Sequence, residues 1–208
     1  MPVQHVVKQG DTIASIAYGS GLLPDTVWND SANGELKARR KTPNTLLPGD
    51  VVVIPDPRVK QQACATGSRH RFKRKAVPAK LIVQLLEDGE PRANVDYELV
   101  VDGVVKQGTT DGDGYVRETI SPDARQAILR LPDREEIKLK VGHLDPPDLV
   151  SGAQGRLNNL GFNAGPVSGE MNPATEAAIK AFQSDSQLEV TGRLDEATIN
   201  KLKQRHGE

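Results

Sequence analysis

Two stretches decide the fold of the N-terminal part of this chain: HVVKQGDTI at residues 5–13 and LPGDVVVIP at residues 47–55. The start of the first stretch predicts a short strand, which Gly10 interrupts. Asp11 then predicts the beginning of a helix, because its side chain can accept hydrogen bonds from the N–H groups of the first turn. The β-branched run in the second stretch predicts another strand, and the prolines that follow it end that strand.

Two helices are expected between these strands, which gives the order β-α-α-β. The apolar residues at helical spacing in the first helix are Ile13, Ile16 and Ala17. The second helix begins at Leu23-Pro24-Asp25, and its apolar positions are Val27, Trp28 and, later, Leu36. We interpret Trp28 as a core residue rather than as a platform for a sugar ring, because it stands next to Val27 on a helix.

The pattern V-K-x-G-D-T, followed by P-G-D and a closing I-P, resembles a LysM domain over residues 1–57. The resemblance implies binding of N-acetylglucosamine-containing glycans such as peptidoglycan or chitin, in a groove between the loop after the first strand and the loop before the second. The residues that it implicates are Gln9, Gly10, Asp11, Thr12, Ile13, Leu46, Leu47, Pro48 and Gly49. Backbone amides and short polar groups would recognise N-acetyl groups there. The stretch from Asn29 to Asn44 departs from the family pattern, because it is longer and more basic than usual.

Residues 58–78 carry seven basic and no acidic side chains and show no periodicity. We interpret them as a solvated linker, with attraction to an anionic wall polymer or to an acidic partner as the alternative. Phe72 is the one aromatic residue of the basic run 69–75, so the run lacks a stacking platform for nucleic acid. Cys64 lies in the same segment without a positioned base and is interpreted as an incidental thiol.

Residues 79–148 predict a small all-β sandwich, because turn signals recur about every ten residues between short apolar runs. Asp102-Gly103 predicts a β-hairpin. Asp111-Gly112-Asp113-Gly114 invites comparison with a calcium loop, but an EF-hand needs ligands where Tyr115 and Pro122 stand, so a turn is preferred. The segment resembles transthyretin-like or carboxypeptidase-regulatory-like β domains. Such domains occur in secreted proteins and in spike-associated parts of type VI secretion systems.

Residues 149–208 predict three helices and contain an internal repeat, in which VSGEMNPAT at 167–175 matches VTGRLDEAT at 190–198. Each copy reads as a turn, an Asn or Asp N-cap and a helix, with Pro173 at a first helical position where its missing N–H costs nothing. The glycine-containing turns and the Ala181-Phe182-Gln183 sequence are similar to those of the three-helix peptidoglycan-binding domain found on wall hydrolases.

Composition narrows the function classes. The net charge of −1 gives no overall attraction to nucleic acid or membrane. A single Cys excludes an internal disulfide, and the four His are not spaced as metal ligands, so we expect no metal, no cofactor and no catalytic residue. No N-terminal signal peptide is evident. We therefore expect synthesis in the cytoplasm and action at the cell wall or periplasm after non-classical export.

The sequence predicts a multi-domain α+β protein with a βααβ LysM module at 1–57, a linker at 58–78, a β sandwich at 79–148 and a three-helix bundle at 149–208. The function that these modules indicate is non-catalytic binding of peptidoglycan, or another N-acetylglucosamine polymer, through both ends. The alternative is a structural or adaptor component of a type VI secretion or other contractile injection apparatus, with a spike or effector protein as the partner.

Overall fold

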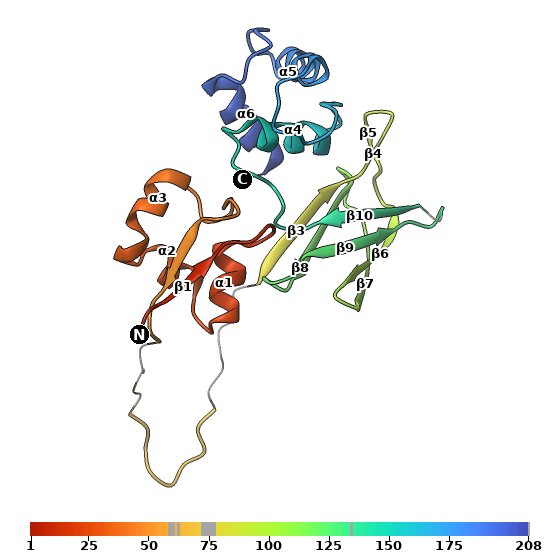
Figure 1. The fold of residues 1–208 in the computed structure, drawn as a ribbon. Coiled ribbons are helices and arrows are strands. Elements are labelled where there is room, and N and C mark those ends of the chain that lie inside the picture. The colour runs from red at the N-terminus through yellow and green to blue at the C-terminus, as the bar shows by residue number, and fades with distance from the viewer. Residues whose placement is uncertain (58–60, 62, 72–77, 134, 208) are drawn as a thin grey trace. The chain divides into compact units, whose positions relative to one another are not determined.

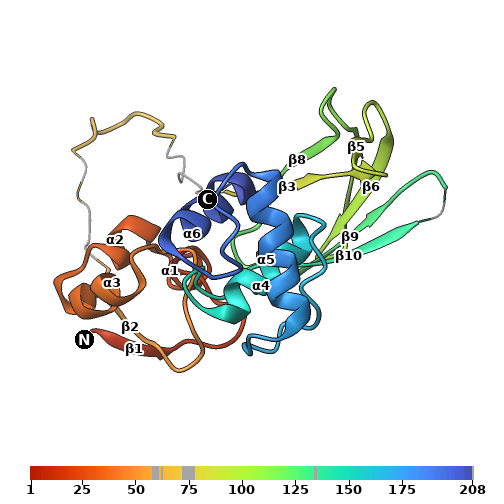
Figure 2. The ribbon, with the colours of Figure 1, turned by 90° about the horizontal axis from the view of Figure 1, so that it is seen from above.

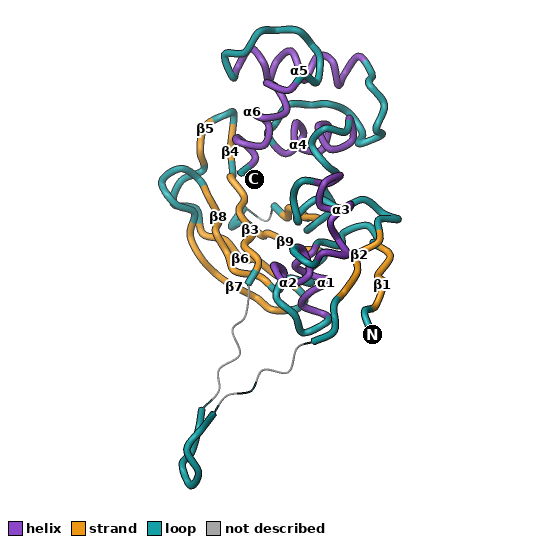
Figure 3. Tube along the Cα trace, turned by 90° about the vertical axis from the view of Figure 1, so that its left-hand side faces the viewer, coloured by secondary structure: helices purple, strands orange, loops and turns teal. Residues whose placement is uncertain are grey.

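The computed structural model describes residues 1–57, 61, 63–71, 78–133 and 135–207. The chain divides into two compact units, of which the first comprises Met1–Asn44 and Gly49–Gly142. The second comprises Thr45–Pro48 and His143–Glu208. Much of the predicted basic linker, including Phe72, lies outside the described residues. Its described residues, 61, 63–71 and 78, form neither helix nor strand (Figure 3).

The N-terminal part has the expected strand–helices–strand order, with a different division of the helices (Figure 1). Its elements are β1 (Val3–Val6), α1 (Ile13–Gly19), α2 (Pro24–Trp28), the 3-10 turn η1 (Ser31–Asn33), α3 (Gly34–Arg40) and β2 (Val51–Ile54). The two strands pair antiparallel, with Val3 opposite Ile54 and Val6 opposite Val51. Mixed α and β structure is therefore confirmed for this part of the chain.

The predicted second helix is divided between Trp28 and Gly34, and the side chain of Asn33 in this region makes long-range hydrogen bonds. This buried amide donates to the Val27 carbonyl at 2.8 Å and to the Val53 carbonyl at 2.7 Å, and it accepts from the Val53 N–H at 2.8 Å. Asn33 thus ties α2 to β2. Because these bonds depend on a residue far along the chain, local periodicity cannot reveal the break.

The start of α1 also differs from the expectation. Thr12, not Asp11, is the N-cap residue, and it forms a capping box in which Thr12 and Ser15 each accept from the other's backbone N–H. The apolar face of the helix is placed as predicted, since Ile13 and Ala17 are fully buried. Trp28 is 7% exposed, so the expectation of a core position is confirmed.

Residues 79–142 form β sheets around one apolar core, all of whose paired strands are antiparallel. The strands are β3 (Ala79–Gln84), β4 (Leu86–Glu87), β5 (Glu90–Pro91), β6 (Asp96–Val101), β7 (Val104–Thr109), β8 (Tyr115–Ile120), β9 (Gln126–Arg130) and β10 (Glu136–Lys140). One sheet has the order β10-β9-β6-β7, β3 pairs with β8, and β4 with β5. The predicted hairpin at Asp102-Gly103 joins β6 to β7, with both residues at positive φ.

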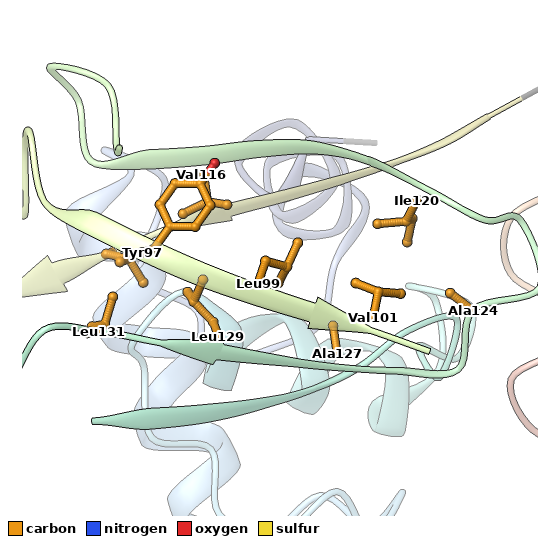
Figure 4. Close-up of a cluster of buried hydrophobic side chains, with 10 residues drawn as sticks. Tyr97, Leu99, Val101, Val116, Ile120, Ala124, Ala127, Leu129 and Leu131 are labelled. Atoms are coloured by element: carbon orange, nitrogen blue, oxygen red, sulfur yellow. The ribbon is translucent and has the colours of Figure 1, made fainter. Parts of the chain in front are cut away.

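Alternate residues of β6 point into this core (Figure 4). Tyr97, Leu99 and Val101 are buried there together with Val116 of β8 and Leu129 of β9. Gly108 lies opposite Tyr97 on the neighbouring strand, and a Cβ at this glycine would fall 2.5 Å from the tyrosine oxygen. The strand glycine therefore provides the space that the largest side chain of the core needs.

The C-terminal unit contains three helices, α4 (Val150–Asn159), α5 (Pro173–Asp185) and α6 (Glu196–His206) (Figure 2). Helix α4 packs against both of the others. The fully buried side chains shared between them include Leu157, Ile179, Phe182 and Leu202. Phe162 meets Phe182 edge-on, with ring centroids 5.4 Å apart.

This unit begins upstream of the expected residue 149, because the chain at Asp145 and Pro146 packs on α4. A Cβ at Gly152 would lie 1.9 Å from the Pro146 carbonyl oxygen. Arg156 is fully buried, and its Nη1 donates to the Asp145 carbonyl at 2.7 Å and to the Gly152 carbonyl at 2.8 Å. The arginine thereby fixes the entry of the chain into the helical unit.

Candidate functional site

The residues implicated in glycan binding by the N-terminal sequence pattern differ widely in accessibility. Gln9, Pro48 and Gly49 are exposed, and Thr12 and Leu47 are half-buried. The buried members of the set are Gly10, Asp11, Ile13 and Leu46. Only the exposed and half-buried residues offer side chains or backbone to a ligand, while the buried ones can act only by shaping the loops.

Backbone hydrogen bonds join the ends of the loop between β1 and α1 to the residues that flank the loop before β2. The Val7 N–H donates to the Asp50 carbonyl at 2.8 Å, and the Gly49 N–H donates to the Val7 carbonyl at 2.9 Å. At the other end of the loop between β1 and α1, the Ile13 N–H donates to the Pro43 carbonyl at 3.2 Å. The loop between β1 and α1 is therefore bonded at its start to Gly49 and Asp50 and at its end to Pro43, which flank the loop before β2.

Asp11 is used inside the loop rather than presented to solvent. Its Oδ2 lies 2.8 Å from His5 Nε2 and accepts from the Lys8 N–H at 2.9 Å. Burial alone would raise the pKa of Asp11, but the hydrogen bonds with His5 and with the Lys8 N–H, together with the positive charge of Arg125, outweigh burial and lower the pKa from its usual value. This carboxylate holds the G-D-T turn in shape.

The basic stretch that departs from the sequence pattern is anchored to the motif aspartate Asp50. Arg40 donates two hydrogen bonds to that carboxylate, from Nε at 2.7 Å and from Nη2 at 2.8 Å. Asp50 is buried, and the neighbouring Arg39 stays mostly exposed at 3.7 Å from it. The sequence does not single out Arg40 from its basic neighbours. The structure shows that it joins the end of α3 to the start of β2.

In the C-terminal unit, Gln154 of α4 holds the loop that contains the first copy of the internal repeat. Its Oε1 accepts from the Ser168 and Gly169 N–H groups, both at 3.0 Å. Its Nε2 donates to the Glu170 carbonyl at 3.0 Å and to Thr175 Oγ1 at 2.9 Å. The glutamine side chain is fully buried, so its polar atoms depend on these bonds with the protein.

Gln183 of α5 holds the second copy with the equivalent atoms. Its Oε1 accepts from the Gly192 N–H at 2.9 Å, and its Nε2 donates to Thr191 Oγ1, to the Arg193 carbonyl and to Thr198 Oγ1. The repeat is therefore structural as well as sequential: one loop (residues 167–171, the first loop) and its copy (residues 190–194, the second loop) are each fixed by a buried glutamine from the preceding helix.

The residues that follow the loops are N-caps, as the sequence predicts. Asn172 accepts from the Thr175 N–H at 2.9 Å and Asp195 from the Thr198 N–H at 2.8 Å. The hydrogen bonds from the backbone and the hydroxyl of Thr198 lower the pKa of Asp195. The two copies thus present the same geometry with one neutral and one ionised cap.

Within the described part of the chain, no group of three or more His, Cys, Asp or Glu side chains is placed to hold a metal ion. No described helix is long and apolar enough to cross a membrane. The turn at residues 111–114 is organised by Asp111, which accepts from the Asp113 and Tyr115 N–H groups.

Comparison with known proteins agrees with the C-terminal geometry. Residues 147–202 match the family described as “Putative peptidoglycan binding domain”, which confirms the resemblance expected for the helical unit. Two relatives, both named Localization factor PodJL and from two strains of Caulobacter vibrioides, are 44% identical over 50 residues. That match spans 24% of this chain and 5% of each relative. No solved structure matches the chain.

Proposed function

We propose that this chain is a non-catalytic bacterial peptidoglycan-binding protein with a glycan-binding module at each end. The observation that carries the proposal is the family match over residues 147–202, which falls on the unit with the duplicated loops. The intervening β domain would act as a spacer. Action at the cell wall follows from this ligand.

The N-terminal module is proposed to bind N-acetylglucosamine units with the accessible members of the expected set. Gln9 and Thr12 offer polar groups, and Leu47, Pro48 and Gly49 offer apolar surface and backbone. Short polar groups suit the hydroxyl and amide groups at the edge of a sugar ring, and aliphatic groups suit its apolar faces. The buried Asp11 supports the loop that carries Gln9 and Thr12 through its bonds to His5 and Lys8.

Two modules on one chain gain affinity for a polymer that both can reach. The second binding event becomes intramolecular, and avidity can exceed either single affinity by a factor on the order of 10² or more. Each module by itself is then expected to bind weakly. When the protein concentration limits binding, deletion of either module should reduce the amount of protein bound to the polymer by more than half.

The test is sedimentation of the purified chain with insoluble peptidoglycan, beside chains that lack residues 1–57 or residues 143–208. Each deletion is expected to weaken binding, and circular dichroism of each truncated chain serves as the folding control. Binding that is as strong without residues 143–208 as with them would contradict a role for the helical unit. Absence of binding by the intact chain would overturn the proposal and leave a protein partner, such as a secretion-spike or effector protein, as the ligand to seek.

A further inference from the structure

The first and second loops of the C-terminal unit are held alike from inside but covered differently from outside. Gly192 in the second loop is buried, and a Cβ there would lie 2.6 Å from Lys180 Cε and 3.2 Å from Glu176 Cγ. Lys180 Nζ pairs with Glu176 Oε1 at 2.5 Å along α5. The hydrocarbon stems of this ion pair therefore lie across the second loop.

The equivalent glycine of the first loop is uncovered. Gly169 is exposed, and a Cβ there would meet nothing nearer than Ser151 Cβ, at 3.8 Å. Ser151 stands three residues before Gln154, as Lys180 stands three residues before Gln183. A short serine thus occupies the helix position that a long lysine fills in the second copy, and no described side chain reaches Gly169 as Glu176 reaches Gly192, so the first loop is left open.

The open loop exposes apolar side chains on both sides of its bare glycine. Val167 is 55% exposed and Met171 is 48% exposed. Between them lie the backbone of Gly169 and the carboxylate of Glu170, which is also exposed. Buried Gln154 uses its own polar atoms to fix this arrangement, so the loop has its shape before a ligand arrives.

We infer that the first loop, residues 167–171 with Ser151 beside it, is the surface of the C-terminal unit that contacts the glycan chain of peptidoglycan. The second loop is then a structural copy, closed by Lys180. The inference rests on the proposed function and adds which of two equivalent loops binds. A pyranose with an N-acetyl group matches the surface, because its apolar face and methyl group can cover Val167 and Met171. Its hydroxyl and amide hydrogens can donate to Glu170.

The internal repeat supplies a matched pair of variants for the test, Val167→Asp and Val190→Asp. The two valines occupy equivalent positions, are 55% and 53% exposed, and would gain the same charge. In sedimentation of the full chain with insoluble peptidoglycan, Val167→Asp is expected to weaken binding at least five-fold. Val190→Asp is expected to stay within two-fold of the parent chain. Equal losses, or a larger loss for Val190→Asp, would overturn the inference.

A second pair exchanges the helix residue that distinguishes the copies. Ser151→Lys should cover Gly169 and reduce binding about as much as Val167→Asp, whereas Lys180→Ser should leave binding unchanged. Unaltered thermal unfolding would show that the loss in Ser151→Lys comes from covering the loop. If Ser151→Lys binds like the parent chain, the first loop is not the contact surface. If the parent chain itself does not bind, the proposed function has failed and this inference falls with it.

Discussion

Gln154 and Gln183 make equivalent hydrogen bonds to two loops that are copies of one sequence. Each side chain accepts a glycine N–H and donates to the hydroxyl of a threonine in the next helix. A buried amide with all its partners matters for stability, because removing it leaves several polar groups buried without partners.

Replacing Gln183 by Leu is therefore expected to lower the free energy of unfolding by about 2–4 kcal/mol, since each buried group left without a partner costs about 1–3 kcal/mol. The Gly192 N–H should lose its protection in hydrogen exchange. Gln204→Leu, on the exposed side of α6, is the control and should change stability by less than about 0.5 kcal/mol. An unprotected Gly192 N–H already in the parent chain would contradict the role given to Gln183.

Acid should destabilise the second copy of the repeat more than the first. Because hydrogen bonding lowers the pKa of Asp195 in the folded state, its stabilisation is present above the unfolded value of about 3.9 and is lost as the pH falls through the lower folded value. Asp195→Asn keeps a cap that cannot titrate, as Asn172 does in the first copy. The midpoint of thermal unfolding should fall less steeply between pH 6 and pH 2 for this variant than for the parent chain. Identical dependence of the midpoint on pH would contradict the stabilising role of the Asp195 carboxylate.

Gly152 and Gly155 of α4 face different neighbours, a backbone carbonyl at Gly152 and the end of a leucine side chain at Gly155. Within a helix, alanine is more favourable than glycine by about 1 kcal/mol. Gly152→Ala should nevertheless destabilise the chain by about 2–3 kcal/mol, because its Cβ would strike the Pro146 carbonyl oxygen. Gly155→Ala meets only the Leu144 Cδ2 methyl at 2.9 Å and should remain within about 1 kcal/mol of the parent. Urea denaturation measures both, and a tolerated Gly152→Ala would contradict the packing of residue 146 on α4.

Arg40 and Arg39 approach the same carboxylate from different environments. Arg40→Ala leaves Asp50 buried without its two-bond partner and should cost about 3 kcal/mol. Arg39→Ala removes a side chain that is 59% exposed and should cost less than about 1 kcal/mol. Chemical denaturation of the full chain compares the two, and equal losses would show that the bidentate geometry of Arg40 has no special effect.

The sequence predicts the features that local rules control. The hairpin at Asp102-Gly103 and the caps at Asn172 and Asp195 follow from residue types whose conformations or side-chain oxygens suit those positions. Features that depend on distant partners were not predictable, since nothing next to Asn33 indicates its bonds to Val53, and nothing next to Arg156 indicates its bond to Asp145.

The first and second loops of the C-terminal unit also combine a feature that the sequence reveals with features that depend on distant partners. Comparing Val167 with Val190 finds the repeat, but the two glutamines do not share the spacing of the loops that they hold. A search for equivalent residues at one fixed offset therefore misses them. Which side chain covers which glycine depends on the packing of helix against loop, and only the structure shows that Lys180 lies over Gly192 while Ser151 leaves Gly169 bare.

The short sequence range of the two glutamine networks has a consequence for the order of events during synthesis. Gln154 reaches its threonine 21 residues ahead, and Gln183 reaches its own 15 residues ahead. Contacts of such short range close quickly and require little of the remaining chain. The hydrogen bonds shown for Gln154 reach no residue beyond Thr175, so these bonds of the loop that we infer to bind glycan need no residue of α6, which completes the core beneath α4.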